Sequence, residues 1–189
     1  MSAPANRLAP AILLTWGVAA AVAVQLGLLS RLPFPPPLFV GAGVLFLLIC
    51  AVVVPGFAAW MKSVDIRLVL GFHLVRFVGF YFLWLASVGR LDPFFAEGAG
   101  IGDAITAVGA TGLLLLPEAR EGKWLLIWNI VGFIDILLVM ANALRVVLTN
   151  PAGFAEFFTL PLGLLPTFIV PLIVVSHLVI FLRLRTKPA

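Results

Sequence analysis

Apolar residues fill six long stretches of the chain, separated by short polar or proline-rich breaks. The stretches run from about residue 10 to 29, 38 to 60, 68 to 88, 101 to 116, 124 to 147 and 164 to 184. A helix needs roughly 20 such residues to cross the hydrocarbon core of a bilayer, and only the fourth stretch is clearly shorter. The pattern therefore predicts an all-α, polytopic transmembrane helix bundle of about six spans with short loops.

The breaks between the stretches refine this prediction. Residues 91–100 and 149–163 are rich in Phe, Pro and Gly and carry few charges, so we expect them to lie at the membrane interface. Pro166 and Pro171 are expected to kink the outer half of the last span. Whether the short fourth stretch crosses fully is left open by the pattern.

Composition supports a membrane location. Of the 189 residues, 63% are hydrophobic and only 11% are charged. This composition indicates that lipid contacts most of the protein surface. Six spans use up nearly the whole length. We therefore expect a single integral membrane domain over residues 1–189.

The basic residues predict the orientation. With alternating loops, eight Lys and Arg residues lie on the face that carries both termini, and three lie on the other face. The first set is Arg7, Lys62, Arg67, Arg120, Lys123, Arg183, Arg185 and Lys187, and the second is Arg31, Arg90 and Arg145. The positive-inside rule then places both termini in the cytoplasm. Because the charges are scattered and serve orientation, the net charge of +4 does not indicate nucleic acid binding.

Four ionisable residues inside the spans are the candidates for function, since such groups are costly in a bilayer. His73 lies six residues after Arg67, and His177 lies six residues before Arg183. At about 1.5 Å per residue, the two imidazoles are expected at the same depth, roughly 9 Å inside the cytoplasmic boundary. Arg76 and Asp135 differ in estimated depth by only about 4.5 Å, so they are expected to form a buried ion pair.

Two histidines at matched depth on different helices can hold a haem iron from both sides. The leading hypothesis is a b-type haem protein in electron transfer, with His73 and His177 as axial iron ligands, Arg76 beside the cofactor and quinone as the partner. Glycines would make room for the macrocycle and aromatic residues would line it, namely Gly71, Gly79, Gly132, Phe72, Phe77 and Phe80.

Two other hypotheses stay open. In a small transporter or proton-coupled carrier, Arg76 would bind an anionic group and Asp135 would exchange a proton. In a structural or assembly subunit of a membrane complex, or in a homo-oligomer, the polar residues would serve packing alone. In each case the buried polar network would include Asn129, Asn142 and Asp103. The sequence lacks the motifs GxSxG, HExxH and CxxCH and a phosphate loop, so it leaves open whether the protein is an enzyme.

Four segments of the chain carry a resemblance. They are HLVRFVGFYFL at 73–83, GAGIGD at 98–103, WNIVGFID at 128–135, and LPLGLLPTFIVP at 160–171 with His177 beyond it. With them, the chain resembles a group of small, functionally uncharacterised six-helix proteins of the bacterial inner membrane. The resemblance implies a bacterial inner-membrane location and encourages treating the buried polar residues as one site, but it supplies no mechanism.

Overall fold

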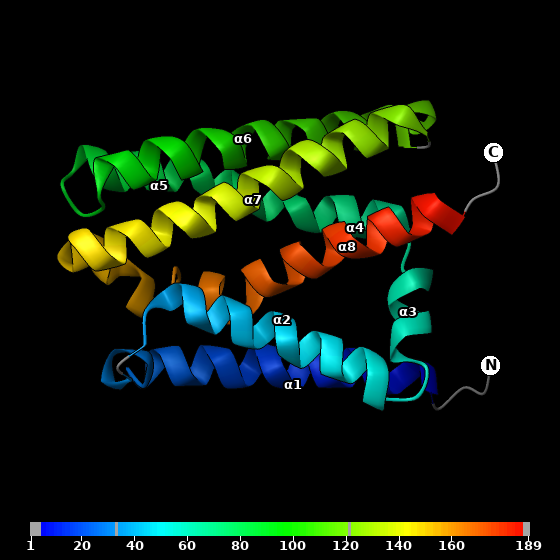
Figure 1. The fold of residues 1–189 in the computed structure, drawn as a ribbon, viewed down its shortest axis with the longest axis horizontal. Helices are drawn as coiled ribbons and strands as arrows, with labels where there is room; N and C mark the ends of the chain where they lie inside the picture. The colour runs from blue at the N-terminus through cyan, green and yellow to red at the C-terminus, as the bar shows by residue number, and fades with distance from the viewer. Residues whose placement is uncertain (1–4, 33, 121, 187–189) are drawn as a thin grey trace. The chain divides into compact units, whose positions relative to one another are not determined.

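The fold is all-α, as the apolar pattern predicts. A computed structural model describes residues 5–32, 34–120 and 122–186, and these residues form helices and turns with no strand. Lys187, counted above for orientation, lies outside the described residues. Figure 1 shows the order of the helices along the chain.

Within the described residues, six helical segments are long and apolar enough to cross a membrane, so the chain is a multi-pass integral membrane protein. They are α1 (Ala5–Gln25), α2 (Pro36–Val53), a third segment made of α4 (Ile66–Phe72), the 3₁₀ helix η2 (His73–Phe77) and α5 (Val78–Ser87), α6 (Pro93–Leu115), α7 (Lys123–Thr149), and a last segment made of the π-helix η5 (Leu165–Ile169) and α8 (Val170–Thr186).

The second span is shorter than predicted. The helix α2 ends at Val53, and Gly56 adopts a left-handed conformation with φ of +78°. Because Pro55 and Gly56 together interrupt the helix, residues 57–60 belong instead to the short helix α3 (Phe57–Ser63). The predicted boundary at residue 60 is therefore wrong.

The fourth span is longer than predicted. Asp92 caps the N-terminus of α6 by accepting a hydrogen bond from the Phe95 N–H at 3.0 Å, and Pro93 occupies the first turn. Residues 93–100 are thus the first turns of α6, and our expectation that they lie at the interface stays a prediction. With 23 residues, α6 is about 34 Å long and can span the bilayer.

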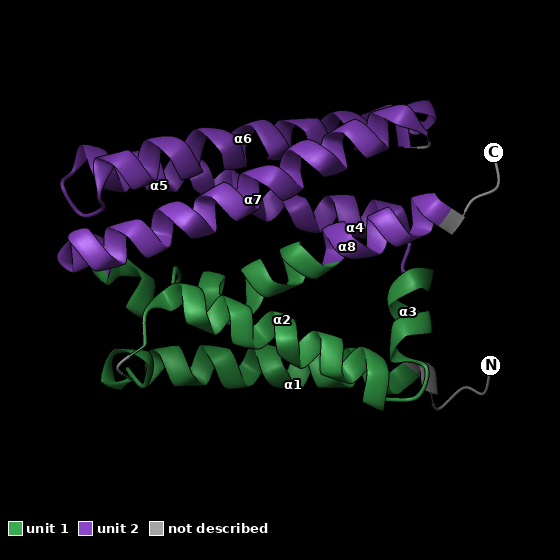
Figure 2. Cartoon of the chain, viewed as in Figure 1, with its two compact units in different colours: residues 1–63, 155–175 green, residues 64–154, 176–189 purple. Residues whose placement is uncertain are grey.

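The described residues divide into two compact units (Figure 2). Unit 1 comprises residues 1–63 and 155–175, and unit 2 comprises residues 64–154 and 176–189. Each unit is described by itself below, and the predicted single domain stays a prediction.

Unit 1 is packed by aromatic and small residues. The Trp16 ring lies edge-on against Phe46 and Phe168, with ring centroids 5.2 and 5.0 Å apart. Gly43 allows Pro171 to pack against α2, because a Cβ at residue 43 would lie 2.6 Å from the proline Cγ. Residues around Pro166 form the π-helix η5, and the kink expected at Pro166 and Pro171 stays a prediction.

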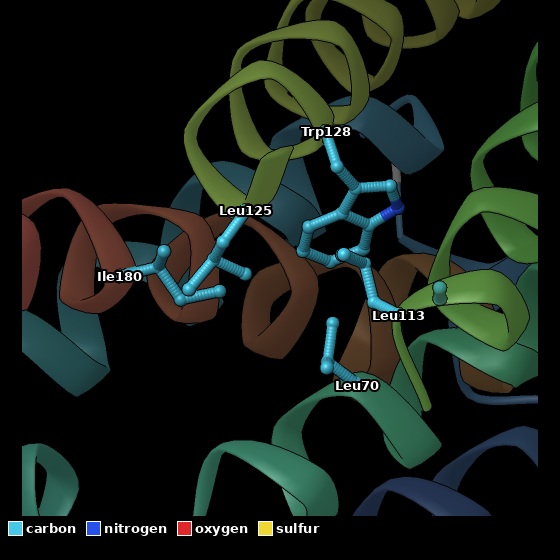
Figure 3. Packing of buried hydrophobic residues seen from close by; sticks show 6 residues of the cluster. Leu70, Leu113, Leu125, Trp128 and Ile180 are labelled. Atoms are coloured by element: carbon cyan, nitrogen blue, oxygen red, sulfur yellow. The ribbon is translucent and has the colours of Figure 1, made fainter. Parts of the chain in front are cut away.

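Unit 2 is built around α6, which packs against α4, η2, α5 and α7. Side chains from several helices form its hydrophobic cluster (Figure 3). The cluster consists of Leu70, Ala110, Leu113, Leu125, Trp128 and Ile180. This cluster lies beside the polar residues that form the candidate site, since Trp128 belongs to both.

Candidate functional site

All six buried polar or charged residues of the described part belong to unit 2, and they are His73, Arg76, Asp103, Thr106, Asn129 and His177. Burying ionisable side chains costs free energy unless each charge finds a partner. The hydrogen bonds around these residues therefore show how the unit tolerates them.

The 3₁₀ helix η2 sets the direction of the first two residues. In a 3₁₀ helix the side chains at i and i+3 lie directly above one another, so His73 and Arg76 point the same way. Both are almost fully buried, with exposures of 0% and 1%. The same three-residue spacing continues through the buried residues Gly79, Phe82 and Leu85.

Arg76 binds two carboxylates and a backbone carbonyl. Its Nε donates to Asp103 Oδ1 at 2.6 Å, and its Nη1 donates to the carbonyl oxygen of Gly132 at 3.0 Å. Its Nη2 forms an ion pair with Asp135 Oδ2. The planar guanidinium suits this arrangement because its N–H groups diverge toward partners on different helices, here α6 and α7. We call Asp103, Arg76 and Asp135 the charge cluster.

Close helix packing makes the charge cluster possible. Between α5 and α6, the backbones meet at Gly79 and Gly100, where a Cβ at residue 100 would lie 2.8 Å from the Gly79 carbonyl oxygen. Two residues along α6, Gly102 leaves the space that the Asp135 carboxylate occupies. Small residues thus bring Asp103 and Asp135 within reach of Arg76.

His73 and His177 lie in contact with each other. Their ring centroids are 4.6 Å apart, with an angle of 63° between the ring planes. His73 Nε2 lies 2.9 Å from the Ser176 hydroxyl, and His177 Nδ1 lies 2.8 Å from Asn129 Oδ1. We call these two residues the histidine pair.

The partners of Asn129 fix the tautomer of His177. The Asn129 amide nitrogen donates to the His177 backbone carbonyl at 3.2 Å, so the amide oxygen is the atom that faces the imidazole. Because this oxygen only accepts, His177 Nδ1 carries the proton and Nε2 has a free lone pair. His177 Nε2 and His73 Nδ1 are both buried without a hydrogen-bond partner among the described residues.

A groove between α6 and α7 reaches the charge cluster. It has a volume of about 410 Å³, its walls are mostly apolar, and its polar lining residues are Asp135, Asn142 and Arg145. The Asp135 side chain is 16% exposed, whereas that of Asp103 is 7% exposed. At the far end of the groove, the Arg145 guanidinium lies 4.1 Å from the centroid of the Phe94 ring. Asp135 is thus the member of the charge cluster that the groove reaches.

The site lies in a segment that matches a known protein family. Residues 33–185 match the family described as a domain of unknown function, DUF8737. The chain belongs to the DUF8737 family. The matched segment includes the charge cluster, the histidine pair and the groove. No curated protein and no solved structure matches the chain.

The DUF8737 segment brings together most of the residues singled out from the sequence. Arg76 and Asp135 form the expected ion pair, and the two histidines meet as their estimated depths predict. Asn142 is separate from the charge cluster, since its amide nitrogen donates to the Phe94 carbonyl and its side chain lines the groove. Phe77 and Phe80, expected to line a cofactor, are instead 37% and 56% exposed.

Two site residues of the DUF8737 segment, Ser176 and Trp128, escaped the sequence analysis, and Asp103, which was predicted for the buried polar network, lies deeper in its helix than expected. Asp103 was expected near the start of a span, but the earlier beginning of α6 puts it in the middle of the helix. Ser176 is a helix residue next to His177, and its hydroxyl gave no signal of its own. Trp128 donates from Nε1 to the Thr106 carbonyl at 2.9 Å and lies against both histidine rings.

Haem b does not fit between the histidine rings as they lie. An iron and its macrocycle between two axial imidazoles require the two rings to stand apart on opposite sides of a plane. Here the rings touch, and Gly132 packs against His177, since a Cβ at residue 132 would lie 2.8 Å from His177 Cε1. The described residues also offer no group of three or more metal-ligating side chains.

Axial ligation by His73 and His177 therefore stays a prediction. An absorption spectrum of the purified protein tests it directly. A Soret band that disappears in a His177→Ala variant would show that the rings separate to admit haem.

Proposed function

We propose that this protein is a small proton-coupled membrane carrier in which Asp135 binds and releases the proton. The support is the composition of the charge cluster, which holds two carboxylates and one guanidinium. With both carboxylates ionised, the cluster is one positive charge short of neutrality. In a membrane interior an uncompensated charge is costly, so one proton is the simplest neutralising partner.

Access from the groove selects Asp135 as the exchanging group. Its Oδ2 pairs with Arg76, and its side chain is the more exposed of the two carboxylates. Asp103 is enclosed at the α5–α6 contact and serves to hold Arg76 in place. The observation that carries the proposal is this position of Asp135, bonded to a buried cluster on one side and reached by the groove on the other.

The role first expected for Arg76 changes in this proposal. All three kinds of guanidinium nitrogen already have partners, and the side chain is buried, so Arg76 holds Asp135 rather than a solute anion. The cation that faces the groove is Arg145. A cotransported solute would then carry an anionic group toward Arg145 and an apolar body along Leu138 and Val139.

Proton flux into liposomes tests the proposal. Purified full-length protein is reconstituted with a pH-sensitive dye inside the vesicles, and a pH gradient is imposed with the membrane potential clamped. We expect flux above that of protein-free vesicles, and its loss in Asp135→Asn. The matched control is Glu118→Gln, the same loss of charge at an exposed residue outside the spans, which should leave flux unchanged.

A purely structural role makes the opposite prediction. Wild-type protein would then show no more flux than empty vesicles and would copurify with fixed partner subunits. Equal flux in wild type and Asp135→Asn would also contradict the proposal, because the carboxyl group would not be the exchanging site.

We further propose a bacterial inner-membrane location, which rests on the resemblance alone, and cytoplasmic termini, which are supported by the eight-to-three distribution of basic residues. Single-cysteine labelling in intact cells tests the orientation. In a Cys50→Ala background, Ser63→Cys should be protected from an impermeant thiol reagent, and Ser87→Cys should react. The reverse pattern would invert the topology.

A further inference from the structure

We infer that His177 Nε2 is a second position for the same proton, on the inner side of the charge cluster, so that Asp135 and His177 form a two-position relay. The inference deepens the proposed function and rests on it. It starts from the free lone pair on Nε2 of His177, a residue with 0% exposure.

The hydrogen bond that His177 makes is compatible with an imidazolium. Asn129 Oδ1 accepts the hydrogen bond from Nδ1 in both the neutral and the protonated ring, so protonation at Nε2 breaks no existing bond. Three aromatic rings surround the imidazole, with centroid distances of 4.6 Å to His73, 5.5 Å to Trp128 and 5.9 Å to Phe133.

The charged groups around the histidine pair come from four elements. They are Arg76 on η2, Asp103 on α6 and Asp135 on α7, and on α8 itself Arg183 lies six residues beyond His177. The charge cluster has a net charge of −1 when both carboxylates are ionised. A proton on His177 brings the cluster and the histidine pair together to zero, as does a proton on Asp135.

Gly132 joins the two proton positions. Its carbonyl oxygen accepts from Arg76 Nη1, and its Cα lies against His177 near Cε1 and Nε2. Asp135 follows three residues later, about 4.5 Å farther along α7. In the step, the Asp135 carboxyl gives up its proton, a water molecule carries it, and His177 Nε2 binds it. The total charge of the five groups is the same before and after.

The geometry favours a proton over a metal ion at this position. Two imidazoles on opposite sides of a metal, with bonds of about 2 Å, need ring centroids roughly 6 Å apart. The observed separation is 4.6 Å. A proton needs no such space.

Nitrogen-15 NMR of the full-length protein in lipid nanodiscs tests the inference without a variant. With both histidines labelled, Nε2 of His177 should titrate from the lone-pair signal to the protonated signal between about pH 4 and pH 9. A His73→Gln variant assigns the signals, since the chain has two histidines. A His177 signal that stays in the unprotonated form throughout this range would overturn the relay.

The dependence on the charge cluster gives a second, sharper test. In Asp135→Asn the cluster is neutral without an extra proton, so the midpoint of the His177 titration should fall by at least about one pH unit, a tenfold loss of proton affinity. Glu118→Gln should not move it. An unchanged midpoint in Asp135→Asn would overturn the coupling between the two positions.

Flux measurements separate this inference from the proposed function. If both hold, His177→Asn lowers proton flux at least tenfold and Asp135→Asn abolishes it. If Asp135→Asn abolishes flux while His177→Asn retains it, the carrier stands and the relay is overturned. If neither variant changes flux, both are overturned.

Discussion

The two units of this protein are packed by different means. Unit 1 fits aromatic rings against glycine and proline, as at Trp16, Gly43 and Pro171. Unit 2 buries an arginine, an aspartate and two histidines, and a second, partly exposed aspartate pairs with the arginine. Apolar packing of the first kind is enough to hold membrane helices together. The polar interior of unit 2 is therefore not needed for packing as such, and this contrast is why we look for function there.

Of the substitutions that test this contrast between the units, removal of Arg76 should have the largest effect on stability. In Arg76→Met, the carboxylates of Asp103 and Asp135 lose their common partner while staying in a buried site. Loss of one side of a buried ion pair costs about 3–5 kcal/mol, so we expect a large drop in the thermal midpoint, measured by circular dichroism in detergent.

A triple variant controls for this result. Arg76→Met combined with Asp103→Asn and Asp135→Asn removes all three charges, and most of the lost stability should return because no charge is left unpaired. Proton flux should stay absent. A triple variant as unstable as the single one would show that shape, and not charge, holds unit 2 together.

The same substitution, glycine to alanine, can be made in each unit to compare them. In unit 2, Gly102→Ala places a methyl group where the Asp135 carboxylate lies, and in unit 1, Gly43→Ala places one against Pro171. Overpacking costs about 1–3 kcal/mol in either place, but only Gly102→Ala should also lower proton flux, because it displaces Asp135 from Arg76.

Gly71→Ala is the matched control for this pair, since a Cβ at residue 71 meets nothing within 4 Å. It should leave both the melting temperature and the flux close to wild type. Equal flux in Gly102→Ala and Gly43→Ala would remove the functional distinction between the two units.

The smallest effect is expected at Asp92, the N-cap residue of α6 in unit 2. The backbone N–H of Phe95 donates to Asp92 and holds the pKa of this carboxyl below its ordinary value, and Asn150 adds a second hydrogen bond. Asp92→Ala should cost about 1 kcal/mol through the lost N-cap of α6. A lowered folded pKa means that the stabilisation is present at neutral pH and is lost as the pH falls below about 4.

Thermal midpoints measured across the acid range check this. The difference between wild type and Asp92→Ala should shrink as the pH falls through the pKa of Asp92 in the folded state. A difference that stays constant with pH would contradict the role of the ionised carboxylate.

The sequence was sufficient for the six spans because hydrocarbon thickness dictates the length of apolar stretches. It was sufficient for the meeting of His73 with His177 because depth follows from helix rise. The prediction from the sequence was wrong at the start of the fourth span, because the helix-start signal there was not used. Asp92 and Pro93 start α6 eight residues before the predicted start, and the depth of Asp103 was missed with them.

Other features of the site cannot be predicted from a pattern in the sequence. The 4.6 Å contact of the imidazoles, which leaves no space for haem between them, depends on how closely the helices approach. The space at Gly102 is likewise visible only once Asp135 is placed against it. The spacing of residues along single helices does not give these distances between helices.

The charge cluster also bears on how the protein enters the membrane. Its three members come from three successive spans, of which α6 is the least apolar of the six. A lone Arg or Asp at the centre of a helix opposes insertion by about 2.5–3.5 kcal/mol. Ion pairing removes that cost only when the neighbouring span is already present. The spans 66–87, 93–115 and 123–149 are therefore expected to leave the translocon together, so the cluster makes biogenesis of this half of the chain cooperative.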